Sequence, residues 1–94
     1  TDPMQLGFFR QAMIGIQISG DTTSVAEKIG KLPSVDYVVL TAGSFDLLVE
    51  VVCENDDDLI DLLNRDIRGI EGVRSTETFV YLRLHKQFYN WGTR

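Results

Sequence analysis

The stretch VDYVVLTAGSFDLLVEVVC, residues 35–53, contains two runs of β-branched and aromatic residues on either side of Gly43-Ser44. Such runs favour extended backbone, and a short glycine-containing break between two of them is typical of a hairpin. We therefore predict one strand over residues 35–41, a turn at Gly43-Ser44, and a second strand over residues 45–53.

Both predicted strands carry apolar residues on both faces. In the first strand, alternation separates Val35, Tyr37 and Val39 from Val38, Leu40 and Ala42. In the second, it separates Phe45, Leu47, Val49 and Val51 from Leu48 and Val52, which share their face with Asp46 and Glu50. Helices of the same chain can cover only one side of such a sheet. We therefore predict that a second copy of the chain covers the other side.

The residues before the hairpin indicate a strand and then a helix. Ile14, Ile16 and Ile18 recur at a period of two, which predicts a strand over residues 12–18. Ser24 and Glu27 have the spacing of a capping box, so a helix is predicted over residues 24–32, ending before Pro33.

The residues after the hairpin indicate a second helix and a last strand. Asn55 is a suitable N-cap, and residues 56–58 are three aspartates that complement the positive end of a helix dipole. The predicted apolar face consists of Leu59, Ile60, Leu63 and Ile67. Gly69 and Gly72 end this helix, and a final strand is predicted over residues 73–84.

The predicted order is strand, helix, strand, strand, helix, strand. A duplicated βαβ unit of this kind folds most simply as a four-stranded antiparallel sheet with both helices on one face. The predicted fold class is therefore α+β, with the ferredoxin-like βαββαβ arrangement.

Composition restricts the possible functions. The 94 residues suffice for one domain, and their formal charge of −5 comes from 14 acidic and 9 scattered basic residues, which argues against direct nucleic-acid binding. No apolar run in these 94 residues approaches the length of a membrane span, and their first residues do not have the pattern of a signal peptide. The single cysteine, Cys53, fits a reducing compartment, so we expect a cytoplasmic protein without membrane contact.

A search for catalytic chemistry yields no candidate. We interpret His85, the one histidine, as solvated and Cys53 as a buried structural thiol. Residues 56–58 lack the pattern of a calcium loop, and the glycines form no phosphate or dinucleotide motif, so no metal and no cofactor is expected. The late aromatics Phe88, Tyr89 and Trp91 favour packing against a neighbouring subunit over base stacking. The chain is therefore not expected to be an enzyme.

The segment Thr41-Ala42-Gly43-Ser44-Phe45-Asp46 has two interpretations. Backbone N–H groups of the turn could face the carboxylate of a small zwitterion while Asp46 faces its ammonium group. Alternatively, Asp46 bonds backbone N–H groups and is structural. The residues by themselves favour the structural interpretation.

The segment TAGSFDLLV, residues 41–49, resembles the hairpin signature of the Lrp/AsnC ligand-binding domain. Residues 32–35 are similar to the helix-to-strand junction of that family, and residues 72–80 to the stretch that opens its fourth strand. Residues 2–7 resemble the segment that leads in from an upstream DNA-binding module. The four motifs occur in the family's order and cover nearly the whole chain.

The resemblance implies an effector-sensing, self-associating domain of a transcription regulator. Residues 1–11 would be a linker and residues 12–94 the domain, which dimerises through its sheet and in many members forms rings of dimers such as an octamer. An amino acid or related small molecule binds at subunit interfaces. DNA is contacted only through a winged helix-turn-helix, which these 94 residues do not contain. The implied ligand-binding residues are Gly43, Ser44, Phe45, Asp46, Thr76 and Thr78.

Two alternatives share the predicted fold. One is an ACT-like regulatory module of a biosynthetic enzyme, which the residues upstream of Thr1 would reveal. The other is a small dimeric α+β-barrel enzyme, whose cavity needs polar or histidine side chains that these strands offer sparingly.

Overall fold

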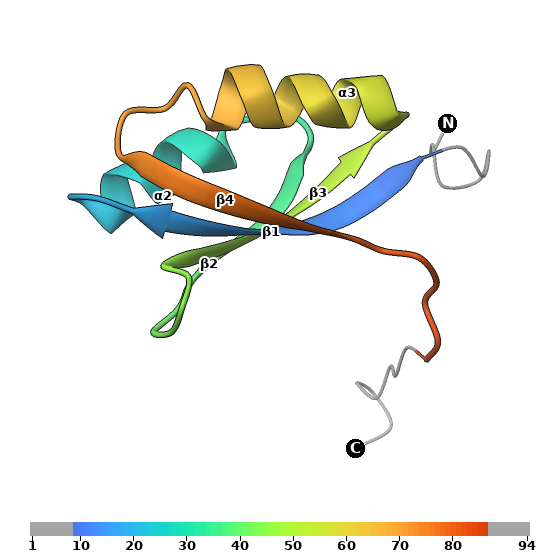
Figure 1. The fold of residues 1–94 in the computed structure, drawn as a ribbon, viewed down its shortest axis with the longest axis horizontal. Helices are drawn as coiled ribbons and strands as arrows, with labels where there is room; N and C mark the ends of the chain where they lie inside the picture. The colour runs from blue at the N-terminus through green and yellow to red at the C-terminus, as the bar shows by residue number, and fades with distance from the viewer. Residues whose placement is uncertain (1–8, 87–94) are drawn as a thin grey trace.

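The structure is a computed structural model and describes residues 9–86. Four strands, β1 (Arg10–Ile18), β2 (Val35–Leu40), β3 (Leu47–Cys53) and β4 (Val73–Val80), form one sheet in the order β2-β3-β1-β4. Every neighbouring pair is antiparallel. Both helical segments lie on the same side of this sheet (Figure 1). The predicted ferredoxin-like fold is confirmed.

The core lies between the sheet and the helices, and the two central strands supply most of it. Their inward side chains pair directly across the ladder, for example Ile14 with Val49 and Ile16 with Leu47. The fully or nearly fully buried apolar residues are Ala12, Ile14, Ile16, Val25, Ile29, Leu47, Val49, Val51, Cys53, Leu59, Leu62 and Ile67. The strand period therefore places every second residue of β1 and β3 against the helices.

The first helix, α2 (Thr22–Gly30), begins two residues earlier than predicted. Asp21, not Ser24, is its N-cap: the Asp21 carboxylate accepts a hydrogen bond from the Thr23 backbone N–H at 3.1 Å. Gly20 lies immediately before this cap with a φ of +103°, a conformation that glycine adopts without strain. The capping-box prediction was wrong because an equally good cap stands closer to the end of β1.

The second helical segment begins as predicted but changes its winding. Asn55 caps α3 (Asp56–Asp61), and its Oδ1 accepts from the Asp58 N–H at 2.8 Å. The chain continues as a π-helical turn, η1 (Leu62–Ile67), in which the Arg68 N–H bonds the Leu63 carbonyl five residues back. Leu59 and Leu62 are buried at helical spacing, whereas Ile60, next to Leu59 in α3, is 51% exposed; the wider turn keeps Ile67 on the buried face five residues after Leu62. The predicted apolar face was therefore wrong at Ile60.

Strand β2 contains an irregularity that changes which residues share a face. Val35 pairs with Val51 and Tyr37 with Glu50, so the register shifts by one residue between them. Val35 consequently faces the helices together with Val38, while Tyr37 and Val39 face the other side. The prediction that Val35 shares a face with Tyr37 was wrong, because simple alternation does not include a bulge.

The last strand is shorter than predicted and ends at Val80 rather than Leu84. The Tyr81 N–H still donates a hydrogen bond to the Gln11 carbonyl at 2.8 Å. Because β1 begins at Arg10, residues after Tyr81 find no further β1 residues with which to pair. Figure 1 shows the chain after β4 running away from the sheet. Leu82 and Leu84 are 97% and 70% exposed there. His85 is also exposed, as predicted.

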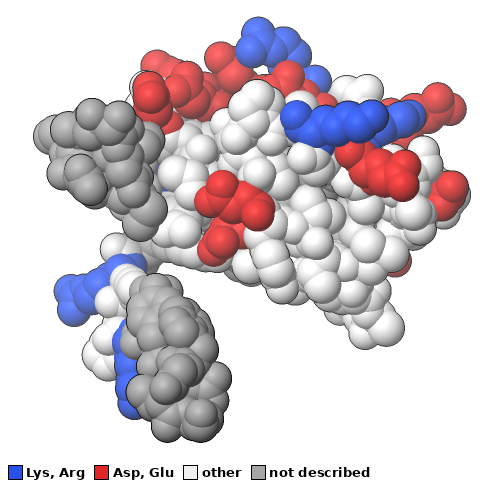
Figure 2. All heavy atoms as spheres, turned by 180° about the vertical axis from the view of Figure 1, so that it is seen from behind, with Lys and Arg blue, Asp and Glu red and all other residues white. Residues whose placement is uncertain are grey.

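Charge is distributed unevenly over the surface. In Figure 2, most acidic and basic side chains gather along the top, where the helices lie, and the surface below is mostly uncharged with one acidic group near its centre. Within residues 9–86, no helix is long and apolar enough to cross a membrane. The segment at residues 2–7 and the aromatics Phe88, Tyr89 and Trp91 lie outside the described residues.

Candidate functional site

The hairpin loop between β2 and β3 is held by hydrogen bonds within the loop and by hydrogen bonds with β1. The Thr41 hydroxyl donates to the Phe45 carbonyl at 2.6 Å, and the Thr41 N–H donates to the Asp46 carbonyl at 3.0 Å. The Gln17 side-chain amide donates to the Ser44 carbonyl at 3.0 Å. Gly43 and Ser44 at the tip are exposed, and a Cβ on Gly43 would meet open space. The tip of the loop is therefore exposed to solvent, while hydrogen bonds fix the conformation of the residues on either side of it.

Asp46 links this hairpin to the end of β1. Its backbone N–H donates to the Ile16 carbonyl at 2.9 Å, and its Oδ2 accepts from the Ile18 N–H at 2.7 Å in a partly buried position. The β1–β4 register shifts between Gln17 and Ile18. The carboxylate thus satisfies a backbone donor at a point where the strand pairing is irregular, which is the structural role considered for it from sequence.

Asp46→Ala is expected to lower the free energy of unfolding by about 1–3 kcal/mol, because it leaves the Ile18 N–H without its charged acceptor. Asp46→Asn keeps an oxygen at that place and should lose less. Urea unfolding followed by circular dichroism measures both. An alanine variant with the wild-type unfolding midpoint would show that water replaces the carboxylate at no cost.

Thr76 and Thr78 lie on β4, on the side of the sheet that faces the helices. They pair with Ile16 and Ile14, whose side chains are fully buried on that side. The Arg68 Nε donates to the Thr76 Oγ1 at 3.3 Å, and the Arg68 Nη1 donates to the Asn64 Oδ1 at 2.9 Å. Arg68 is exposed and retains N–H groups that could bind a carboxylate. Sequence reasoning missed it; its only signal was a cation at the end of the second helix.

Phe45 lies on the opposite side of the sheet from the two threonines. Gly15 alternates with the inward Ile14 and Ile16, so a Cβ on Gly15 would point outward, and there it would meet the Phe45 ring at 2.6 Å. The prediction that Phe45 shares a face with Leu47 was wrong, because β3 begins only at Leu47 and the loop turns the ring outward. Within one chain, the structure therefore does not bring Phe45 together with Thr76 and Thr78.

The outward side of the sheet, called the open face below, carries an apolar and aromatic surface. The strand registers assign to it Gln11, Met13, Gly15, Gln17, Tyr37, Val39, Leu48, Glu50, Val52, Ser75, Glu77, Phe79 and Tyr81. The Phe45 and Phe79 rings meet edge to face at a centroid distance of 6.3 Å. The prediction that apolar residues occupy both faces of the sheet is confirmed.

Tyr81 reaches over the open face from the end of β4 to β3. Its hydroxyl donates to the Glu50 Oε2 at 2.8 Å. Burial raises the pKa of Tyr81 to about 12, and the hydrogen bond to Glu50 and the charge of that carboxylate act in the same direction. The phenol therefore stays protonated and remains a donor at neutral pH.

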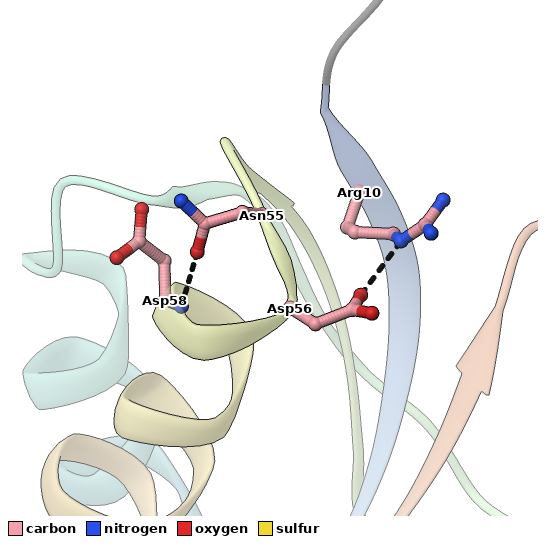
Figure 3. A network of polar contacts seen from close by, with 4 residues as sticks. All are labelled: Arg10, Asn55, Asp56 and Asp58. Atoms are coloured by element: carbon pink, nitrogen blue, oxygen red, sulfur yellow. Dashed lines mark hydrogen bonds and ion pairs between the residues drawn. The ribbon is translucent and has the colours of Figure 1, made fainter.

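The aspartates at the start of α3 have structural partners. Asp56 Oδ1 lies 2.6 Å from the Nε of Arg10 on β1, and the Asp58 backbone N–H donates a hydrogen bond to Asn55 Oδ1 (Figure 3). Both side chains of the ion pair are more than half exposed, so the pair contributes about 0–1 kcal/mol. Among the described residues, no group of His, Cys, Asp or Glu has the arrangement of a metal site.

A depression of about 380 Å³ lies beside α3 and η1, at the end of β3 away from the hairpin. It contains none of the six predicted ligand-binding residues, and its acidic lining is partly compensated by Arg65, which lies 4.0 Å from Asp61 and 3.7 Å from Asp66. Cys53 forms part of its wall but is only 3% exposed. Burial raises the pKa of the Cys53 thiol, a hydrogen bond from Ser34 opposes this, and the charge of Asp58 adds to it. The thiol is therefore protonated and a poor nucleophile.

Comparison with known proteins extends these observations. The HTH-type transcriptional regulator FL11 of Pyrococcus furiosus is 33% identical over 88 residues, which are 93% of this chain and 58% of that protein. The regulatory protein AsnC of Escherichia coli is 31% identical over 85 residues, 88% of this chain and 56% of that protein. The chain thus spans a little over half the length of these curated relatives.

Solved structures show the same fold. The structure of E. coli AsnC superposes with a TM-score of 0.86 at 28% identity, covering 95% of this chain and 61% of that one. A Thermus thermophilus protein gives 0.78 at 29% identity and covers 83% of this chain and 99% of that one. A Neisseria meningitidis transcriptional regulator, solved as a complex with L-methionine, gives 0.81 at 18% identity, covering 93% and 58%.

A family model for the Lrp/AsnC ligand binding domain matches residues 11–91. The match includes the hairpin, both helical segments and all of β4, so it extends over nearly everything that the structure describes. The two curated relatives are described as an HTH-type transcriptional regulator and a regulatory protein. Together these findings show that the chain belongs to the Lrp/AsnC ligand-binding domain family.

Proposed function

We propose that this chain is the effector-sensing and oligomerisation domain of a cytoplasmic transcription regulator. It binds an amino acid or a related small molecule at the interface between copies and thereby modulates DNA binding by a winged helix-turn-helix. The expected boundary after residue 11 moves back because β1 begins at Arg10: residues 1–9 serve as the linker from that module, and residues 10–94 form the domain. The observation that carries the proposal is the open face, an apolar sheet surface beside a polar hairpin in a chain of this family.

Self-association through the open face is supported by its composition. Tyr37 and Phe79 are 51% and 45% exposed in the single chain, beside partly exposed aliphatic residues of β2 and β3. A contiguous surface of this kind is typical of a protein–protein interface. A homodimer formed through this face is the unit from which rings of dimers, such as an octamer, would be built.

The ligand site is proposed at such a contact between copies. Gly43 and Ser44 provide exposed backbone and Asp46 a carboxylate, while Phe45 lies on the other side of the sheet from Thr76 and Thr78, which lie beside Arg68. Because the sheet separates Phe45 from the two threonines within one chain, one ligand can contact Phe45 and the threonines only when they come from different copies. Arg68 would face a carboxylate and Asp46 an ammonium group, which are the two charges of an amino acid.

The L-methionine complex of the Neisseria regulator supports an amino acid as the effector class. The proposal assigns the chain no catalytic role: its one cysteine is buried with a raised pKa, and its one histidine is exposed beyond the last strand. A buried neutral thiol and an isolated imidazole do not constitute a nucleophile–base pair.

Isothermal titration calorimetry against the twenty free amino acids tests the proposal on protein shown to be oligomeric. At least one amino acid should bind, and Asp46→Asn, which keeps the acceptor for the Ile18 N–H but removes the charge, should weaken it by about 1–3 kcal/mol. Asp36→Asn, the same change at an exposed position of β2, should leave the affinity unchanged. Silence across the panel would refute an amino acid as the effector while leaving self-association in place.

A further inference from the structure

The residues that the strand registers assign to the open face include acidic side chains but no Lys or Arg. Arg74 lies at the β1–β4 register shift and is assigned to neither side of the sheet. Among the residues that the strand registers assign to the open face, the charged ones are Glu50 and Glu77, on β3 and β4. Glu50 is partly buried and accepts a hydrogen bond from the neutral Tyr81 hydroxyl. This surface is therefore apolar in its middle and negative in charge.

Pairing two such surfaces creates an electrostatic problem. If a second copy covers the open face, as in the proposed function, each copy brings the carboxylates of Glu50 and Glu77 into the same layer, and none of the register-assigned residues of that face is a cation. Like charges brought together and partly desolvated oppose association unless a cation accompanies them. A stable pair of copies needs a source of positive charge close to this face.

The segment that follows β4 supplies cations at the edge of this face. We define residues 82–86, Leu-Arg-Leu-His-Lys, as the arm. It contains two cations, Arg83 and Lys86, and its two leucines are among the most exposed apolar side chains of the described chain. It follows Tyr81, whose hydroxyl already reaches across the open face to Glu50, and it has no strand partner within the described sheet.

The arm complements the open face in apolar character and in charge. Exposed leucines in an extended, unpaired segment favour contact with another apolar surface. Arg83 and Lys86 carry positive charges, which are opposite to those of Glu50 and Glu77. In its own chain the arm runs away from the sheet, as Figure 1 shows. The arm is therefore suited to bind the sheet of another copy.

We propose that the arm of each copy lies across the open face of a second copy. Leu82 and Leu84 then cover apolar residues of that face, and Arg83 and Lys86 pair with Glu50 and Glu77 of the second copy. This inference rests on the proposed self-association, and it adds the element that makes the two negative faces compatible.

A charge-reversal pair tests the arm. The arm-reversed variant carries Arg83→Glu and Lys86→Glu, and the face-reversed variant carries Glu50→Lys and Glu77→Lys. Each alone opposes like charges between arm and face, so its self-association constant should fall at least about tenfold relative to wild type. In an equimolar mixture, both arm-to-face contacts between unlike copies become attractive. Sedimentation velocity should then show restored, mixed oligomers.

A matched control separates this effect from net charge. Lys28→Glu with Lys31→Glu makes the same change in charge on exposed residues at the end of α2. This variant should associate like wild type. With the face-reversed variant it should form fewer mixed oligomers than the arm-reversed variant does, because its positive arm still opposes the reversed face. Association of the wild type should also weaken as salt concentration rises, a measurement that needs no substitution.

The outcomes distinguish the arm from the proposed function. An oligomeric wild type whose association is unaffected by arm reversal and by salt overturns the arm proposal and leaves sheet-to-sheet association in place. Failure of the mixture to restore association, with both variants folded by circular dichroism, also overturns it. A wild type that sediments as a single 10.6 kDa particle at every concentration overturns both proposals.

Discussion

Replacing Ile14 with alanine is expected to lower the free energy of unfolding by about 2–5 kcal/mol. Ile14 is fully buried at the middle of β1, between Val49 of β3 and Thr78 of β4. Truncation of its side chain leaves a cavity at the centre of the core that residues 9–86 form. Because a small domain has about 5–15 kcal/mol of stability in total, the loss should appear as a large shift of the urea midpoint.

Met13→Ala is the matched control for this prediction. Met13 is the preceding residue of the same strand, but it belongs to the open face and is partly exposed. In dilute protein, where copies are separate, its truncation should cost clearly less than that of Ile14. Equal losses at the two positions would contradict the assignment of the core to the helix side of the sheet.

The order of elements and the side on which the helices lie were predictable because they follow from repeating patterns. Ile14, Ile16 and Ile18 recur every second residue, and Asn55 followed by three aspartates is an unambiguous start of a helix. These signals are local, and the antiparallel pairing of four short strands then leaves few arrangements for two helices.

Irregularities of the backbone were not predictable in the same way. The extra residue in β2 and the π turn at residues 62–67 each shift a periodic pattern by one residue, and neither has a sequence signature. Phe45 was misassigned for a related reason: the loop before β3 breaks the alternation, and the ring lies over Gly15, a residue far away in sequence. When contacts with residues distant in the sequence determine the side of the sheet on which a side chain lies, the periodicity of the sequence cannot predict that side.

The candidate site was predictable only in part. The hairpin was found because glycine, serine and aspartate interrupt two apolar strands. The role of Asp46 as acceptor for the Ile18 N–H depends on how the hairpin lies against β1, and the link from Arg68 to Thr76 depends on the turn after η1. Both are tertiary contacts, so sequence could name the residue types but not their partners.

Leu48→Glu is expected to abolish self-association while leaving the fold of the single chain intact. Leu48 lies on the open face in the middle of the sheet, paired with Gly15 of β1 and Val39 of β2. A carboxylate there is solvated in the separate chain, whereas in the assembly it would be buried in an apolar layer that already contains Glu50. Burying an unpaired charge costs several kcal/mol, so the dissociation constant should rise at least about a hundredfold.

The same substitution at Ile60 provides the control for this prediction. Ile60 is also apolar and 51% exposed, but it lies on the outer surface of α3, on the other side of the molecule from the open face. Ile60→Glu should therefore keep the wild-type oligomeric state in analytical ultracentrifugation. If the Leu48 variant remained associated while the Ile60 variant dissociated, copies would be meeting through their helices. The open face would then be covered by something else, and the exposed leucines of the arm would need another explanation.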